Sequence, residues 1–253
     1  YYLYLKINTM KNTPIIIASI ASLGIVISSV VLGSAFKNRN QSENTISVTG
    51  LGTKQFTSDL ITWSGRFSRD SYEIKEAYNA LAQDRKVIFD YLQSQGIKSN
   101  EVVFSAVDIE KKYNYSTDNE GNSRSTFAGY ELSQKISIES KEVTKIENIS
   151  RNITEIINKG IEFTSSSPQY FYTKLAGLKQ EMIADATKDA KQRAEKIAKN
   201  SGSGLGKLKK ATMGVIQITA PNSDEDYSYG GTFNTHSKEK EASITIKLEY
   251  QVD

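Results

Sequence analysis

The chain has 253 residues, with 32 basic and 29 acidic residues, one histidine, three prolines and no cysteine. This length fits one domain or two small ones. Charged residues make up 24% and hydrophobic residues 38%, which indicates a folded globular chain rather than a disordered one. The lack of cysteine excludes disulfides, thiolate metal sites, cysteine nucleophiles and a lipid-modified cysteine anchor, and the single histidine, His236, excludes any site that needs two imidazoles.

The N-terminal part contains an apolar run at residues 14–36, which has 23 residues and no charge. A helix of this length can cross a lipid bilayer once. Met10 begins a sequence with the order expected of a signal, so we expect residues 1–13 to form an upstream segment and a basic n-region. Residues 1–9 would then come from upstream read-through or a misplaced start.

Two interpretations of residues 14–36 stay open. The small residues 33–35 suit cleavage by a signal peptidase, whereas the run is longer than the usual signal core and therefore suits a retained membrane anchor. Basic residues flank the run on both sides, so the charge pattern does not decide between them. In either case we expect the rest of the chain to be exported.

The exported part consists of a polar linker, residues 37–44, and a domain, residues 45–253. Residues 37–253 carry 30 basic and 29 acidic residues, and a net charge this small does not recruit nucleic acid. A chain of this size buries about 70% of its unfolded surface. The domain can therefore be stable without disulfides.

Hydrophobic periodicity and turn residues predict seven strands and three helices in the order ββαββαβαββ. The predicted strands are 46–50, 60–67, 101–113, 127–140, 161–172, 209–219 and 242–252, and the predicted helices are about 70–95, 141–159 and 174–200. Asp70 and Glu73 have the spacing of a capping box at the start of the first helix. Gly96, Gly160 and Gly202 follow the three helices, as C-terminal caps do.

This order predicts an α+β fold, because strands that follow one another in hairpins form antiparallel sheets with helices on one face. We expect two subdomain-like halves with the three helices packed on the sheets. The N-terminal transmembrane or signal helix precedes them.

The segment 220–241 is long for a hairpin connection and is rich in tyrosine and glycine. Its aromatic residues Tyr227, Tyr229 and Phe233 are the candidate partner-contact residues, because exposed aromatics in one loop suit a contact surface. The alternative, that they fold back onto the protein, stays open.

No catalytic, cofactor-binding or metal-binding residue is predicted. His236 has no nucleophile motif near it, and we expect it to be a solvated loop residue. The glycines at 202, 204 and 206 follow a helix and precede a strand, whereas a phosphate-binding loop follows a strand and opens a helix.

Several short motifs occur in an order that resembles the SIMPL-domain family. They are ISVTGLG at 46–52, AYNAL at 77–81, QGI at 95–97, ATKDAKQRAEKIA at 186–198 and the small-residue step at 203–206. The resemblance covers about residues 45–252. The loop at 222–234 is similar to that of a Bacteroidota-like subgroup of these bacterial proteins.

The resemblance implies an exported, periplasmic or envelope-attached α+β protein. It also implies homo-oligomers, as in an envelope antigen of the family, and a link of some relatives to oxidative-stress defence. The family has no agreed enzymatic activity, so no catalytic residue and no cofactor is carried over.

We therefore expect a non-enzymatic, self-assembling envelope protein. Its expected partners are further copies of itself and, if residues 14–36 are not cleaved, the inner membrane; no nucleic acid is expected, and the sequence identifies no other protein or ligand partner. One alternative is a periplasmic module that binds a small apolar or peptidic ligand in a groove between helices and sheet. The least favoured alternative is an uncharacterised enzyme.

Overall fold

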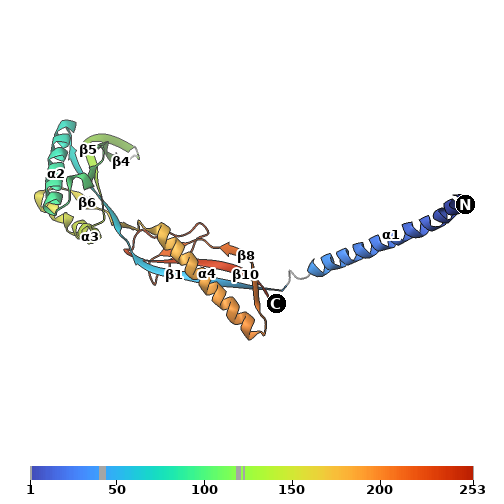
Figure 1. The fold of residues 1–253 in the computed structure, drawn as a ribbon. Helices are drawn as coiled ribbons and strands as arrows, with labels where there is room; N and C mark the ends of the chain where they lie inside the picture. Colours follow the sequence, from blue (N-terminus) through green and yellow to red (C-terminus); the bar gives the residue numbers. More distant parts are fainter. Residues whose placement is uncertain (1, 40–43, 118–120, 122, 253) are drawn as a thin grey trace. The chain divides into compact units, whose positions relative to one another are not determined.

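The computed structural model describes residues 2–39, 44–117, 121 and 123–252, with backbone only at 2–13 and 37–39. Figure 1 shows the helices and strands of the chain. The chain divides into two compact units. The first comprises Tyr1–Gly50, Thr187–Met213 and Ile246–Asp253, and the second comprises Leu51–Ala186 and Gly214–Thr245. Each unit combines segments from distant parts of the sequence, so the units are not successive halves of the chain.

The N-terminal helix α1 (Tyr2–Arg39) contains the predicted apolar run. Its segment Pro14–Phe36 has a mean hydropathy of 2.6 and exposed side chains, and it is the one helix among the described residues that is long and apolar enough to cross a membrane. The predicted apolar helix is thus confirmed. A membrane anchor and a signal sequence both have this form.

The first sheet has the strand order β1 (Thr45–Thr57), β10 (Glu239–Val252) and β8 (Leu205–Met213), and β9 (Gln217–Thr219) also pairs with β10. Alternate residues of β10 are buried, as the period of two predicts. They are Ala242, Ile244, Ile246, Leu248 and Tyr250.

Helix α4 (Leu175–Asn200) buries a face of small residues. At Gly52 of β1 a Cβ atom would lie 2.5 Å from the Met182 carbonyl oxygen and 3.3 Å from the Ala186 Cβ. Glycine on the strand and alanine on the helix therefore allow the two backbones to approach closely here.

The second sheet lies within the second unit and has the order β3 (Val102–Phe104), β5 (Ser123–Ser140), β2 (Leu60–Ser71) and β6 (Phe163–Ser165). Strand β4 (Asp108–Thr117) pairs with β5, and β7 (Gln169–Phe171) pairs with β2. The longest ladder joins β2 to β5 antiparallel, from Ile61 opposite Ser140 to Ser71 opposite Tyr130.

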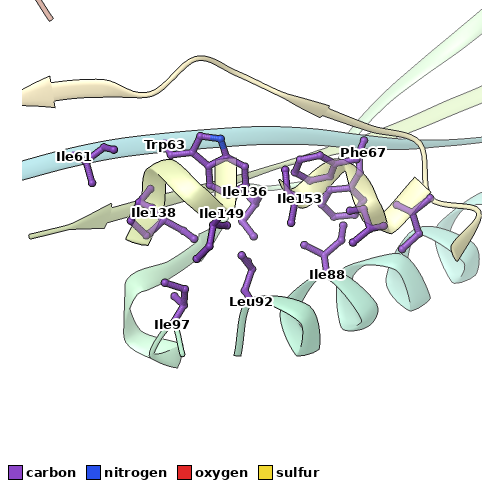
Figure 2. Packing of buried hydrophobic residues seen from close by; sticks show 14 of the residues in the cluster. Ile61, Trp63, Phe67, Ile88, Leu92, Ile97, Ile136, Ile138, Ile149 and Ile153 are labelled. Atoms are coloured by element: carbon purple, nitrogen blue, oxygen red, sulfur yellow. The ribbon is translucent and has the colours of Figure 1, made fainter. Parts of the chain in front are cut away.

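Helices α2 (Ile74–Ser94) and α3 (Val143–Asn152) cover one face of this sheet, and the 3-10 helix η3 (Ile153–Lys159) continues α3. Figure 2 shows the core side chains of the two strands and the helices meeting in one cluster. It includes Ile61, Trp63, Phe67, Ile88, Leu92, Ile97, Ile136, Ile138, Ile149 and Ile153.

A buried ion pair joins α2 to this sheet. The Arg69 guanidinium donates to both carboxylate oxygens of Asp84, at 2.5 and 2.8 Å, and to the Gly160 carbonyl at 2.8 Å. The Asp84 carboxylate is buried, and its hydrogen bonds with Arg69 raise the pKa of that guanidinium. Gly160 has a φ of 73°, which confirms its predicted role as a left-handed helix cap.

The predicted α+β class and the antiparallel pairing are confirmed, but some boundaries are wrong. The predicted capping box is absent: Asp70 lies in β2, and α2 begins at Ile74 after Glu73, whose side chain makes no cap. The ladder with β5 continues through Ser71 and keeps this segment extended.

Two predicted strands are each divided in two. Residues 101–113 form a 3-10 turn, η2 (Ser99–Glu101), followed by β3 and β4, and residues 209–219 belong to β8 and β9. The predicted strand 161–172 is likewise divided around Pro168 into β6 and β7. Part of the predicted hairpin tip, 118–120 and 122, lies outside the described residues.

Strands β1 and β2 follow one another but do not form the expected hairpin. Strand β1 pairs with β10, whereas β2 pairs with β5, β6 and β7. Ser58 and Asp59 lie between the two strands, but pairing partners distant in sequence decide the sheet to which each strand belongs.

Gly65 offers a test of the core, because it lies on the helix-covered face of β2. A Cβ atom at this position would overlap the ring of Phe163, which stacks on Trp63 with ring centroids 6.1 Å apart. We expect Gly65→Ala to lower the free energy of unfolding by about 1–3 kcal/mol, as overpacking does. Chemical denaturation measures this change.

The control is Gly177→Ala. Gly177 lies in α4 with nothing within 4 Å of its Cβ position, so the stability of this variant should equal or exceed that of the unchanged protein. Equal stability of both variants would contradict the packing described.

Candidate functional site

The long segment between β9 and β10 is an ordered structure that returns along β9. The Ile218 amide donates to the Thr232 carbonyl, and the Asn234 amide donates to the Ile218 carbonyl, both at 2.8 Å. These bonds create a parallel bridge between Ile218 and Phe233. The start and the end of the loop are thereby fixed to the first sheet.

The side chain of Gln217 is the first polar group that organises the loop. Its Nε2 donates to the Ser228 carbonyl at 2.8 Å, and its Oε1 accepts from the amides of Thr232 at 2.7 Å and Ser228 at 3.3 Å. Gln217 is buried, so these bonds satisfy groups that would otherwise be costly to bury. They hold the part of the loop that carries the tyrosines.

Lys240 is the second organising group and is fully buried. Its Nζ donates to the carbonyls of Asn234 at 2.5 Å and Ser237 at 2.7 Å. Asn234 is also buried, and its Oδ1 accepts from the amides of His236 at 3.0 Å and Ser237 at 2.8 Å. Lys240 and Asn234 thus close the turn that leads into β10.

Glu225 connects this cluster to the middle of the loop. Its Oε1 accepts a hydrogen bond from the Asn234 Nδ2, and its buried Oε2 has no partner among the described residues. Burial lowers the pKa of Lys240 to about 8, although the Glu225 carboxylate opposes that shift.

The loop brings two of the three predicted contact residues together. Tyr227 is largely exposed and Tyr229 fully exposed, and with Leu51 and Val215 they line a shallow hollow of about 330 Å³. We call these four residues the tyrosine surface. Phe233 does not line this hollow; it stacks on Phe171 with ring centroids 6.4 Å apart.

The tyrosine surface has the chemistry of a contact site. Leu51 and Val215 are each about half exposed, at 48% and 49%, and carry no charge. Polar groups of Gln217, Ser243 and Thr245 line the same hollow, and the Ser243 hydroxyl donates to the Tyr227 oxygen at 3.2 Å. Aromatic faces beside hydroxyl groups can bind an apolar surface and hydrogen-bond with its polar rim.

Other predicted features of the loop contribute backbone rather than side-chain chemistry. His236 contributes its backbone amide, which donates to the Asn234 Oδ1 at 3.0 Å. Among the residues that the structure describes, no three His, Asp or Glu side chains come together in a way that could hold a metal ion.

The sequence analysis missed Leu51, Val215, Gln217 and Lys240 as parts of this site. A signal existed for Lys240, because it lies two residues before Ala242 and four before Ile244 on the buried face of β10. Its register therefore indicated a buried lysine. For Leu51 and Val215 no local signal existed, since the fold brings them beside the tyrosines.

Replacing Lys240 with methionine tests whether its buried ammonium group holds the turn before β10. The folded pKa of about 8 lies below the ordinary value of 10.5, so between these values the unfolded chain binds more protons than the folded one. The stability of the unchanged protein should therefore rise from pH 8 to pH 9.5 relative to Lys240→Met, by at most about 1.4 kcal/mol per pH unit. Denaturant unfolding at several pH values measures this difference.

The control for this experiment is Lys247→Met on the same strand, whose side chain is exposed. Its stability difference from the unchanged protein should not depend on pH over this range. A pH-independent difference for Lys240→Met as well would contradict a buried, charged Lys240.

Comparison with known proteins places this architecture in a family. The model of the SIMPL family (DUF541), described as a protein of unknown function, matches residues 46–252. The chain is also 23% identical over 180 residues to the 26 kDa periplasmic immunogenic protein of Brucella abortus (strain S19), a match that covers 69% of each chain. The family match spans both sheets, all the helices after α1 and the tyrosine loop, and the chain therefore belongs to the SIMPL family.

Proposed function

We propose that this protein is a non-enzymatic component of the bacterial cell envelope that assembles with copies of itself through the tyrosine surface. The observation that carries the proposal is the exposure of Tyr227 and Tyr229 on a loop that buried polar side chains hold in place. A preordered aromatic surface loses little conformational entropy when a partner covers it. Tyrosine is also enriched in the cores of protein interfaces.

The proposed location is the periplasm. It is supported by the periplasmic relative and by the apolar helix α1, which has the length of a signal or an anchor. If α1 is retained, it attaches the domain to the inner membrane. A part in oxidative-stress defence stays a prediction that depends on the family resemblance alone.

The alternative of a ligand groove between helices and sheet has less support. In the second unit, the surface that α2 and α3 share with the sheet is filled by the core cluster (Figure 2). A hollow of about 420 Å³ beside α2 and β3 is lined by Arg85, whose guanidinium lies 4.5 Å from the centre of the Phe104 ring. Arg85 and Lys86 border this hollow, so an apolar ligand there would have to cover two cations, which is costly.

Light scattering after size exclusion tests the assembly, with the full chain in a neutral detergent. We expect one discrete mass that is a multiple of the chain mass. The double variant Tyr227→Ser, Tyr229→Ser should shift it towards the single chain, because the contact loses its aromatic area. Tyr115→Ser is the matched control, since Tyr115 is 79% exposed on β4 away from the loop, and it should leave the mass unchanged.

Two results would overturn the proposal. One is a single-chain mass for the unchanged protein at every concentration examined. The other is an assembly that the double variant preserves, which would place the contact on another surface.

A further inference from the structure

The second sheet has an open face, opposite the one that α2 and α3 cover. Residues of β2 and β5 that alternate with the core side chains form this face, and they are polar. Two adjoining hollows of about 760 and about 450 Å³ lie on it, and Ser64, Lys135 and Ser166 line both. This polar face is independent of the tyrosine surface.

The centre of the polar face contains two cations side by side. Arg66 of β2 lies directly opposite Lys135 of β5 in the ladder, and both line the smaller hollow. Among the described residues, neither side chain has an ion pair or a hydrogen bond. Like charges at directly opposed positions destabilise a sheet. This pair therefore costs free energy in the unliganded protein.

Serines flank the basic pair on both sides. Ser64 lies opposite Ser137 in one flanking row, and Ser68 lies opposite Ser133 in the other. Ser64 and Ser137 line the hollows without being buried, and their hydroxyl groups can donate hydrogen bonds to a ligand. Ser166, whose amide donates to the Ser64 carbonyl at 2.9 Å, borders the same space.

Three carboxylates border the hollows without neutralising the pair. Glu101 accepts hydrogen bonds from the Ser140 hydroxyl and the Lys98 amide, and Glu139 lies opposite Thr62, four residues beyond Lys135 in β5. Asp108 of β4 lines the smaller hollow opposite Ser133. None of the three forms an ion pair with Arg66 or Lys135, so the two positive charges face the hollow together.

The geometry points to a binding site for a small oxyanion, a carboxylate or a phosphate on a hydroxylated molecule, between Arg66 and Lys135. An anion there interacts with both cations and removes their mutual repulsion. The planar guanidinium of Arg66 suits both oxyanions, because it can donate two parallel hydrogen bonds. The hydroxyl groups of Ser64, Ser137 and Ser166 then accommodate the hydroxyl groups of the ligand.

Calorimetric titration of the full chain in a neutral detergent tests the site, with inorganic phosphate, glucuronate and uncharged glucose as probes. We expect saturable binding of phosphate or glucuronate and none of glucose. The anion that binds with the higher affinity identifies the ligand group as a phosphate or a carboxylate.

Two charge variants and one control make the test specific. Arg66→Gln and Lys135→Gln should each weaken anion binding about tenfold or more, because each removes a charge-assisted contact. Lys247→Gln, an exposed lysine on β10, should bind as the unchanged protein does. Each charge variant should also melt at the same or a higher temperature than the unchanged protein, since it removes the repulsion.

The melting temperatures separate loss of the site from loss of the fold. The inference is overturned if neither anion saturates or if glucose binds as well as the anions do. It is also overturned if the two charge variants bind as tightly as the control.

Discussion

The antiparallel ladder between β2 and β5 is the constraint on which the second unit depends. Because side chains alternate across a strand, one register places Trp63 and Ile138 in the core and Arg66 and Lys135 on the open face. A slip of one residue would bury the charges and expose the core. The core cluster therefore fixes the position of the basic pair, and the repulsion within the pair is tolerated because the burial of the core outweighs it.

The tyrosine loop depends on the same period of two in β10. Lys240 lies on the buried face of that strand, where a hydrophobic side chain would be the ordinary choice. Its ammonium group instead binds two carbonyl oxygens of the turn and, with Gln217 and Asn234, supplies the hydrogen bonds that a long polar segment needs. These hydrogen bonds offset the cost of burying the ammonium group and fix the turn, while Tyr229 of the same loop stays exposed.

The two surfaces differ in chemistry and are built differently. The tyrosine surface is aromatic and neutral, is carried by a loop, and suits a large flat partner. The polar face is basic and rich in hydroxyl groups, is carried by two central strands, and suits a small anion. An assembly through the first surface would leave the second available, because no residue lines both hollows.

The sequence by itself determined the elements whose signals are local. The uncharged run 14–36 specified an apolar helix, the alanine stripe specified α4, and Gly160 specified the end of η3, because each signal acts within a few residues. The order of short motifs also indicated the SIMPL family, which the family match to residues 46–252 establishes.

Only the tertiary structure decided which strands pair and in which register. It extended β2 through Asp70 in place of the predicted capping box and put β1 and β2 in different sheets. It also placed Phe233 on Phe171, away from the two tyrosines. It also brought Arg66 opposite Lys135. Strand pairing depends on contacts between residues far apart in the chain, and the burial of a whole core selects among the possible registers, so no short stretch of sequence contains this information.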